Sequence, residues 1–342
     1  MARVQRSVIL IFLFMLAACA KSISFSVNIN DNNSIASNEA ATATPFAAVP
    51  SPTPWVEGTQ TALANQPLSM TMDSANLTAL PTFSFQEVTQ QTVERPTDFS
   101  PVLYGGNLYG KSFFLLLGGA SQNGWIEPAE SFARFSGEVT YSLNTLMIPS
   151  KYFVWGKAPQ FSPTCQNYFV ETDAPLEEPG YTAVVDGWNI TKREVTELAD
   201  DGSVYEEVVL NWLKSQGVDT PQPGTLQIVR TDLEGDGVNE IFISATHLDG
   251  SQHITNPGDY SIVLMRRAVG NEAVTIPLEA NVYSAENSGT TFPRTYSLAN
   301  FIDLNQDGVM EVVVDIRKWE GFGARIFQIN GQNVTQVLSA VC

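Results

Sequence analysis

A nine-residue acidic loop occurs twice in the C-terminal half of the chain, and each copy runs directly into a β-branched segment. The first copy, DLEGDGVNE, spans residues 232–240 and precedes IFISAT. The second copy, DLNQDGVME, spans residues 303–311 and precedes VVVDIR. Asp-Gly sequences favour tight turns, and β-branched residues favour strands. The duplicated loop–strand unit therefore predicts a sheet-forming C-terminal half.

The spacing within each copy suits a hard cation. Both copies follow the pattern D-x-[E/N]-x-D-G-V-x-E, in which oxygen ligands at positions 1, 3, 5 and 9 converge if the chain coils tightly between them. Gly237 and Gly308, at position 6, permit the sharp turn, and the carbonyls of Val238 and Val309 supply position 7. An EF-hand would need a glutamate at position 12 and a following helix, but position 12 lies inside a predicted strand.

These residues resemble the calcium loops of FG-GAP and VCBS-type repeats, in which an Asp-rich loop joins two strands of a propeller blade. The resemblance implies calcium as a structural cofactor. The implied ligands are Asp232, Glu234, Asp236, Val238 and Glu240 in the first loop, and Asp303, Asn305, Asp307, Val309 and Glu311 in the second.

Two features of the loops depart from that family. Glu234 is longer than the usual Asp or Asn, which predicts a distorted first site. Two copies are also too few for a complete propeller, which takes at least about four blades. The alternative interpretation is that the loops are Asp-Gly turns solvated by water, without metal. The wider C-terminal pattern, with WEG at residues 319–321 and a terminal cysteine, resembles exported bacterial proteins with no assigned activity.

The N-terminus has the parts of an export signal. Arg3 and Arg6 precede an apolar run at residues 8–18, which is shorter than the roughly 20 residues that span a bilayer. The run ends in LAAC, which resembles the lipobox of bacterial lipoproteins. The resemblance implies a signal peptide at residues 1–18 and a lipid on Cys19. The chain would then be held to a membrane on its extracytoplasmic side, the outer membrane if the host has one. An ordinary signal peptide with a coincidental cysteine is the alternative.

Composition shifts divide the rest of the chain. Residues 19–95 are rich in Ser, Thr, Pro and Asn and show no helical or strand periodicity, which predicts a lipidated N-terminus followed by a disordered stalk. We predict that residues 96–200 form the N-terminal part of an ectodomain. Residues 201–342 are predicted to form a helix followed by a β-rich part that carries the two loops.

The net charge of the chain limits the classes of partner that are expected. The chain has 18 Lys and Arg against 36 Asp and Glu, and this excess of acid excludes nucleic acid as an expected partner. The acidic balance suits solubility and divalent cations.

If Cys19 carries lipid, Cys165 and Cys342 remain as an even pair in an oxidising compartment, and we predict a disulfide between them. Two isolated thiols are the alternative.

The predicted fold is α+β and β-rich, with antiparallel sheets, propeller-blade-like C-terminal repeats and at least one packed helix, but not a complete propeller. A Ser203–Glu206 capping box and an apolar stripe predict a helix over residues 204–216, with Gly217 as its stop. A shorter helix is predicted within residues 127–135. Strands are predicted at residues 112–117, 138–147, 151–155, 225–230, 240–246, 261–266, 311–316 and 324–329.

Three other features of the sequence are not expected to form binding sites. Residues 105–112 fit the phosphate-loop pattern, but a strand is predicted where that motif needs a helix, so no nucleotide is expected. His247 and His253 flank an aspartate in a loop-like stretch, where idle histidines are commoner than a zinc site. The aromatic residues are predicted to lie in the core rather than in a sugar-stacking cleft; they are Tyr152, Phe153, Trp155, Tyr181 and Trp188.

No catalytic residues emerge from the sequence. There is no G-x-S-x-G elbow, and the carboxylates are too numerous to single out an acid–base pair. The leading expectation is a non-catalytic module for adhesion, envelope assembly or binding of an extracellular glycan or protein. A hydrolase acting on a glycan or cell-envelope polymer is the alternative, and a purely structural envelope component is a third. A deep cleft with carboxylates facing aromatics would indicate an enzyme, and a shallow face a binding module.

Overall fold

The computed structural model describes residues 98–108, 111–135, 137–147, 152–173, 175–176, 180–199, 204–249, 254–319 and 321–342. The chain divides into two units, Met1–Phe83 and Ser84–Cys342, and every described residue belongs to the second unit. The predicted signal peptide, Cys19 and the predicted stalk lie outside the described residues, as do Ser203 and His253.

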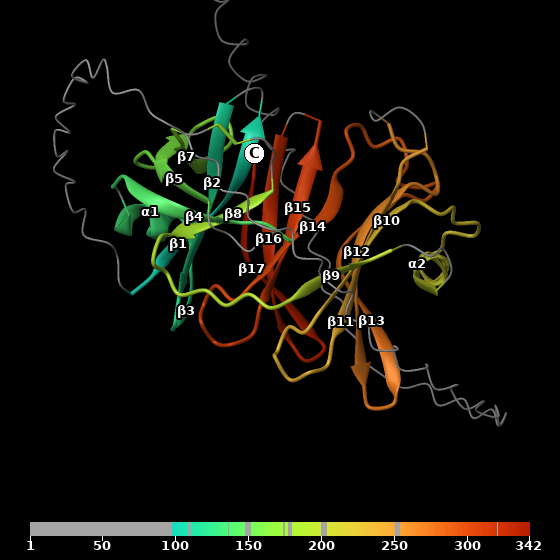
Figure 1. Cartoon of the computed structure of the whole chain (residues 1–342). Coiled ribbons are helices and arrows are strands. Elements are labelled where there is room, and N and C mark those ends of the chain that lie inside the picture. The colour runs from blue at the N-terminus through green and yellow to red at the C-terminus, as the bar shows by residue number, and fades with distance from the viewer. Residues whose placement is uncertain are drawn as a thin grey trace, which may run out of the picture. The chain divides into compact units, whose positions relative to one another are not determined.

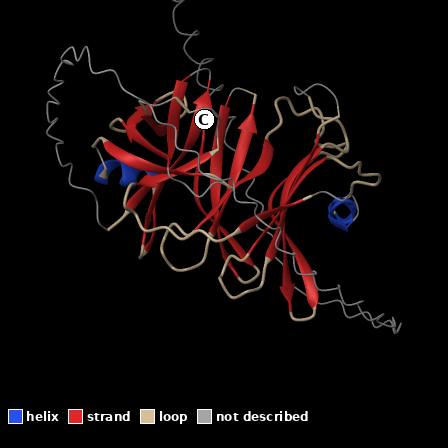
Figure 2. Cartoon of the chain, viewed as in Figure 1, coloured by secondary structure: helices blue, strands red, loops and turns tan. Residues whose placement is uncertain are grey.

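Seventeen strands and two helices are described, and the strands form three antiparallel sheets (Figures 1 and 2). The first sheet has the order β5-β4-β8-β1-β2-β7-β6, and β3 pairs with β2 off this path. Its strands are β1 (Ser100–Leu108), β2 (Lys111–Ser121), β3 (Gly124–Ile126), β4 (Val139–Asn144), β5 (Tyr152–Gly156), β6 (Gln160–Ser162), β7 (Asn167–Glu171) and β8 (Tyr181–Val185).

The other two sheets are meanders of consecutive strands. The second sheet has the order β13-β12-β11-β10-β9, and the third has the order β14-β15-β16-β17. The strands of the second sheet are β9 (Val195–Leu198), β10 (Thr225–Thr231), β11 (Glu240–His247), β12 (Tyr260–Val269) and β13 (Glu272–Val282). Those of the third are β14 (Thr295–Ile302), β15 (Glu311–Lys318), β16 (Gly321–Asn330) and β17 (Asn333–Val341).

The third sheet is the middle layer of the unit. One of its faces packs against the first sheet, where Val313 and Ala324 meet Leu115 and Leu117. The opposite face packs against the second sheet, in a core that also contains Val312 and Val314 from β15. Because successive strand residues point to opposite faces, the continuous apolar run of β15 serves both cores.

Two helices cover the outer faces of the stack (Figure 1). Helix α1 (Pro128–Arg134) lies on the first sheet, with Phe132 against its outer core. Helix α2 (Val204–Ser215) buries Val209 and Leu213 against the outer face of the second sheet. The spacing of these two residues places them one turn apart on a single helix face, so burial against a sheet fixes the orientation of α2.

Cys165 and Cys342 form a pair at disulfide distance, with their Cα atoms 4.8 Å apart and a sequence separation of 177. The pair joins the β6–β7 turn of the first sheet to the end of the chain, directly after β17 of the third. The predicted pairing of these two cysteines is therefore present as a disulfide-distance contact.

The predicted β-rich, antiparallel α+β fold is confirmed, including the packed helix and the blade-like C-terminal meanders short of a propeller. The strand predicted at residues 112–117 is longer in the structure, because β2 continues through Gly118 and Gly119. A Cβ at Gly118 would lie 2.5 Å from the Ile126 carbonyl oxygen, so this glycine allows close strand packing. The strands not anticipated from the sequence are β1, β3, β6, β7, β8, β9, β13, β14 and β17.

Candidate metal centre

The two acidic loops occupy equivalent places in neighbouring sheets. The first joins β10 to β11, where Thr231 pairs with Glu240, and the second joins β14 to β15, where Ile302 pairs with Glu311. The loops also touch each other, because the amide of Met310 donates to the carbonyl of Leu233 at 3.0 Å. The ten ligands implied by the sequence thus lie in two loops that contact each other.

In the first loop, Asp232 folds the chain around its own carboxylate. Its two oxygens accept hydrogen bonds from the amides of Gly235 (2.6 Å), Asp236 (3.2 Å) and Gly237 (2.8 Å). Burial raises the pKa of the Asp232 carboxyl, but these three backbone donors and the positive charge of Arg193 together hold the pKa below its ordinary value. Gly235 and Gly237 have φ angles of 76° and 87°, a backbone region that favours glycine.

Two other acidic groups of the first loop, Glu234 and Glu240, face an arginine. The Nη2 atom of Arg267, on β12, lies 3.0 Å from Glu234 Oε1 and 3.7 Å from Glu240 Oε1. Its Nη1 atom donates to the carbonyl of Gly331 at 2.6 Å. The side chain of Arg267 is 15% exposed, so this cation is held close to the loop and partly shielded from water.

In the second loop, carboxylates again accept hydrogen bonds from loop amides, and the loop is more deeply buried. Asp303 Oδ2 accepts from the amide of Gly308 at 3.1 Å, and Asp307 Oδ1 accepts from the amide of Val309 at 2.8 Å. Asn305 uses both ends of its amide on Asp307: its oxygen accepts from the backbone amide, and its nitrogen donates to Oδ2, each at 3.0 Å. These contacts preorganise the loop.

Two carboxylate oxygens in the second loop are buried without a hydrogen-bond partner among the described residues. They are Asp303 Oδ1 and Glu311 Oε1, on residues that are 2% and 0% exposed. The other oxygen of Glu311 accepts from the amide of Leu304 at 2.8 Å. Burial raises the pKa of Glu311 to about 8 and raises that of Asp303 above its ordinary value. Hard oxygen donors without a counter-charge are the ligands that calcium prefers, so the donor set fits the implied metal.

The segment that leads from β8 to β9 runs across both loops. The indole nitrogen of Trp188 donates to the Leu304 carbonyl at 2.8 Å, and the amide of Asp303 donates to the Thr191 carbonyl at 2.9 Å. The guanidinium of Arg193 donates to the carbonyls of Leu233 and Gly308, both at 2.6 Å. The loops therefore hold in place the segment that connects the first sheet to the second.

Neither arginine was anticipated from the sequence, because Arg193 and Arg267 lie far from the loops along the chain. Among the described residues, no three His, Cys, Asp or Glu side chains converge as a ready-made metal cluster. Such a cluster would consist of side chains alone, whereas the implied calcium set includes an asparagine and main-chain carbonyls. The carboxylates also accept hydrogen bonds from loop amides, so oxygens that would share one ion are partly turned toward the backbone.

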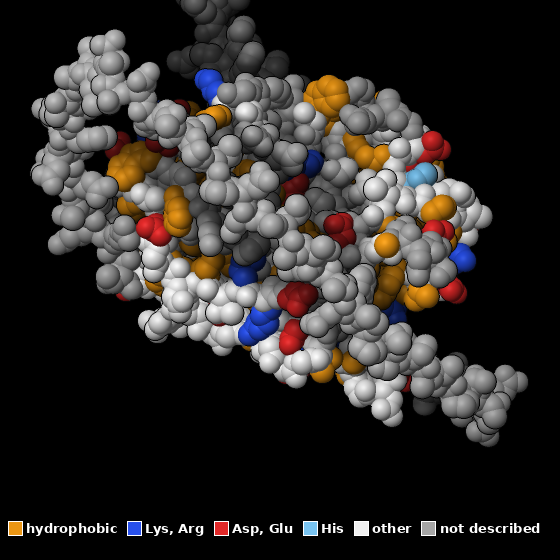
Figure 3. All heavy atoms as spheres, viewed as in Figure 1, with side chains coloured by type: hydrophobic (Ala, Val, Ile, Leu, Met, Phe, Trp, Pro, Cys, Tyr) orange, Lys and Arg blue, Asp and Glu red, His pale blue; other side chains and the backbone are white. Residues whose placement is uncertain are grey.

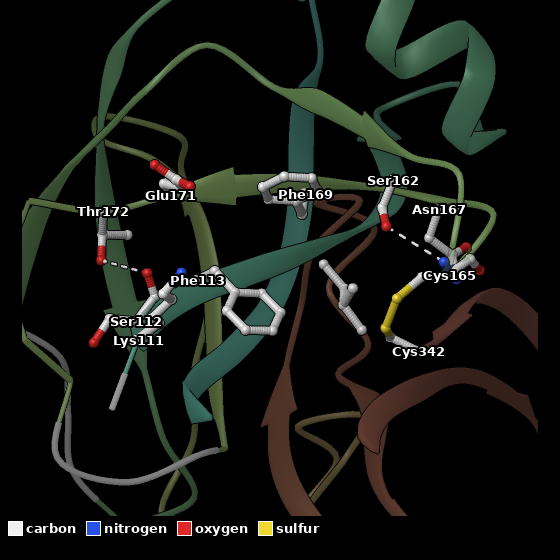
Figure 4. A pocket seen from close by; sticks show the side chains of 11 residues that line it. Lys111, Ser112, Phe113, Ser162, Cys165, Asn167, Phe169, Glu171, Thr172 and Cys342 are labelled. Atoms are coloured by element: carbon white, nitrogen blue, oxygen red, sulfur yellow. Dashed lines mark hydrogen bonds between the residues drawn. A yellow bond between two sulfur atoms is a disulfide. The ribbon is translucent and has the colours of Figure 1, made fainter. Parts of the chain in front are cut away.

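A separate cavity of about 570 Å³ lies beside the disulfide (Figure 4). The rings of Phe113 and Phe169 line its middle; the Cys165–Cys342 pair lies at one end and Lys111 at the other. The remaining lining residues are Ser112, Leu115, Ser162, Asn167, Glu171 and Thr172. No residue of either acidic loop lines this cavity.

The aromatic residues considered for a sugar-stacking cleft do not lie together in one cleft. Phe153 and Trp155 are 55% and 40% exposed on β5, an edge strand, so the expectation that they are core residues is wrong. Tyr181 and Trp188 pack against two different cores. Nothing is described of the Tyr152 side chain. None of these residues lines the described cavity.

Two further sequence motifs fall within the first and second sheets. The phosphate-loop pattern at residues 105–112 lies in the β1–β2 hairpin, and strand β2 occupies the place of the helix that the motif requires. His247, at the end of β11, stacks on Tyr260 with ring centroids 5.9 Å apart. The second histidine of the pair, His253, lies outside the described residues.

The visible face of the unit carries acidic and basic side chains in mixture, and its hydrophobic side chains lie in small separate groups (Figure 3). None of the described helices is both long and apolar enough to cross a membrane. No family model, curated protein or solved structure matches the chain.

Proposed function

We propose that this protein is a membrane-anchored extracytoplasmic lipoprotein, held by a lipid on Cys19, whose calcium-stabilised ectodomain is a non-catalytic module for binding, adhesion or envelope assembly. The observation that carries the calcium part is the pair of buried, unpartnered carboxylate oxygens on Asp303 and Glu311. Burying a carboxylate oxygen without a partner is costly, and a divalent cation removes that cost. The LAAC sequence supports the anchor.

The calcium is assigned a structural role. The loops contact the segment that connects the first and second sheets through Trp188, Thr191 and Arg193, and none of their residues lines the cavity. A cation that stiffens the loops would therefore stabilise the arrangement of the sheets. An extracellular affinity of roughly 10⁻⁴ to 10⁻³ M is sufficient for this role.

The cavity favours a binding module over a hydrolase of the two-carboxylate type. Two facing carboxyl groups are the usual requirement for glycoside hydrolysis. Glu171 is the one acidic side chain among the cavity residues, and it lies 2.8 Å from the ammonium of Lys157. The aromatic rings of Phe113 and Phe169 beside polar groups suit the binding of an amphipathic ligand, such as a glycan or a peptide.

Thermal unfolding of the full chain with excess EDTA and with millimolar calcium tests this proposal. Calcium at tenfold its dissociation constant should raise the midpoint by about 3–6 °C, because only the folded state binds it. The rise should disappear in the Asp236→Ala/Asp307→Ala double variant. It should persist in Asp219→Ala, which removes an exposed carboxylate outside both loops. An unchanged midpoint in the parent protein would exclude a structural calcium site.

A further inference from the structure

We infer that the two loops are not equivalent: the guanidinium of Arg267 stands in for the metal in the first loop, so the chain binds one divalent cation, in the second loop. This inference rests on the proposed calcium binding and deepens it, because the sequence pattern alone implies a cation in each loop. The inference follows from a difference between the loops. Carboxylates of the first loop face a guanidinium, whereas those of the second face no basic side chain among the described residues.

In the first loop, a positive charge already lies beside two of the four implied side-chain ligands. One nitrogen of Arg267 is shared between Glu234, at position 3, and Glu240, at position 9. Both carboxylates would ligate the ion if calcium were bound. A calcium ion there would lie next to a guanidinium that cannot be deprotonated, so the arginine would have to leave first.

Arg267 is well anchored in this position. Its other terminal nitrogen donates to the carbonyl of Gly331 in the turn between β16 and β17, and its side chain is largely buried. An internal cation held by strand β12 does not depend on the calcium concentration, and its ordering is part of folding. It therefore has an advantage over an ion that binds with an affinity of roughly 10⁻⁴ to 10⁻³ M.

The residue at position 3 explains the difference between the loops. Glu234 has one more methylene group than an aspartate and reaches Arg267 with Oε1. Asn305, its counterpart in the second loop, is short and neutral and bonds to Asp307 instead. The unusual glutamate, which the sequence suggested would distort a calcium site, is thus the partner of an arginine.

In the second loop, no basic side chain pairs with a carboxylate among the described residues. Arg193 contacts this loop, but it donates to the carbonyl of Gly308 rather than to an acid. Gln328 supplies only an amide, which donates to Asp307 at 3.2 Å. Asp303 and Glu311 each keep one buried oxygen free. In the first loop, the comparable free oxygen belongs to Glu234, whose other oxygen Arg267 already holds.

Equilibrium dialysis of the full chain against radioactive calcium tests the inference by stoichiometry. The parent protein should bind one calcium ion, and Asp307→Asn should bind none. Arg267→Met, which keeps the apolar stem but removes the cation, should bind two. Asp236→Asn, the matched change in the first loop, should leave the parent stoichiometry at one. Arg266→Met is the control for Arg267→Met, because Arg266 contacts Thr275 rather than a loop carboxylate.

The outcomes separate this inference from the proposed function. Two ions in the parent would overturn the inference and leave calcium binding intact, whereas none would overturn both. One ion that is lost in Asp236→Asn and kept in Asp307→Asn would also overturn it. A folded Arg267→Met variant that still binds one ion would do the same. If Arg267→Met does not fold, Arg267→Gln repeats the test, because its amide can still donate to the Gly331 carbonyl.

Discussion

Two fully buried tyrosines of the first sheet differ in whether their hydroxyl groups have a partner. Tyr104 donates to Asp315 Oδ1 of the third sheet at 2.6 Å, and Arg317 contacts the other oxygen of the same carboxylate at 2.5 Å. The hydroxyl of Tyr141 has no hydrogen-bond partner among the described residues. A buried polar group stabilises a fold only when it is paired, so the two hydroxyl groups should have opposite effects.

We predict that Tyr141→Phe raises the free energy of unfolding by about 1 kcal/mol, because it removes an unpaired buried hydroxyl group. Tyr104→Phe is the matched comparison and should lower it by about 1.5–3 kcal/mol, since the partner carboxylate loses a donor. Urea denaturation followed by fluorescence measures both changes. Equal destabilisation by the two substitutions would show that Tyr141 has a partner after all.

At the scale of elements, the segment between β8 and β9 has no regular structure of its own apart from one bridge, at Thr191. It is held by its contacts with the acidic loops and by Lys192, whose ammonium donates to the carbonyl of Thr145 at 2.5 Å. Burial lowers the pKa of Lys192 from 10.5 to about 8, because the charged form loses hydration. This segment therefore contains a charge that folding disfavours.

The sign of the pH dependence follows from that shift. Below about pH 8 the ammonium is charged in both states, and the folded state bears the full desolvation cost. The cost declines as pH rises toward 10.5, because the folded state releases its proton first. We therefore expect the stability of the parent relative to Lys192→Met to increase between pH 8 and 10.

Urea unfolding of the parent and Lys192→Met at both ends of this window measures the difference. The control is Lys214→Met, which removes the same charge from an exposed position on α2 and should show no comparable change. A relative stability of Lys192→Met that does not vary across the window would mean that Lys192 is well hydrated in the folded protein.

At the scale of the whole molecule, the layers are joined by contacts between residues far apart in the chain. Tyr104 bonds to Asp315 between the first and third sheets. Arg325 of the third sheet contacts both carboxylate oxygens of Glu279 in the second, at 2.5 and 2.7 Å. The Cys165–Cys342 pair adds a covalent-distance contact between the first and third sheets. These links connect all three sheets within one unit.

The proposed anchor is also a property of the whole molecule. Cells that express the chain should incorporate a radioactive fatty acid into the protein, and the Cys19→Ser variant should not, because the thiol is the proposed lipid acceptor. Cys165→Ser is the control and should keep the label. Labelling that persists in Cys19→Ser, or that is absent from the parent, would contradict the lipoprotein assignment.

The sequence by itself determined the local features. Asp-Gly turns followed by β-branched runs predict strands β11 and β15, and an apolar stripe ended by Gly217 predicts α2, all of which are present. These elements are fixed by interactions between residues close in the chain. Weakly patterned strands such as β7, β8 and β17 were missed, because pairing with distant neighbours stabilises them.

Only the tertiary structure decided what surrounds the loops. Sequence spacing treats the two acidic motifs as equals, since it counts ligands and not their neighbours. Folding places Arg267 of β12 beside Glu234 and leaves Asp303 and Glu311 without a counter-charge. The electrostatics of a carboxylate depend on burial and on charges within a few ångströms, wherever those charges lie in the chain. That is why the pattern could predict two cation-binding loops and single out Glu234 as unusual, but could not place Arg267 beside it.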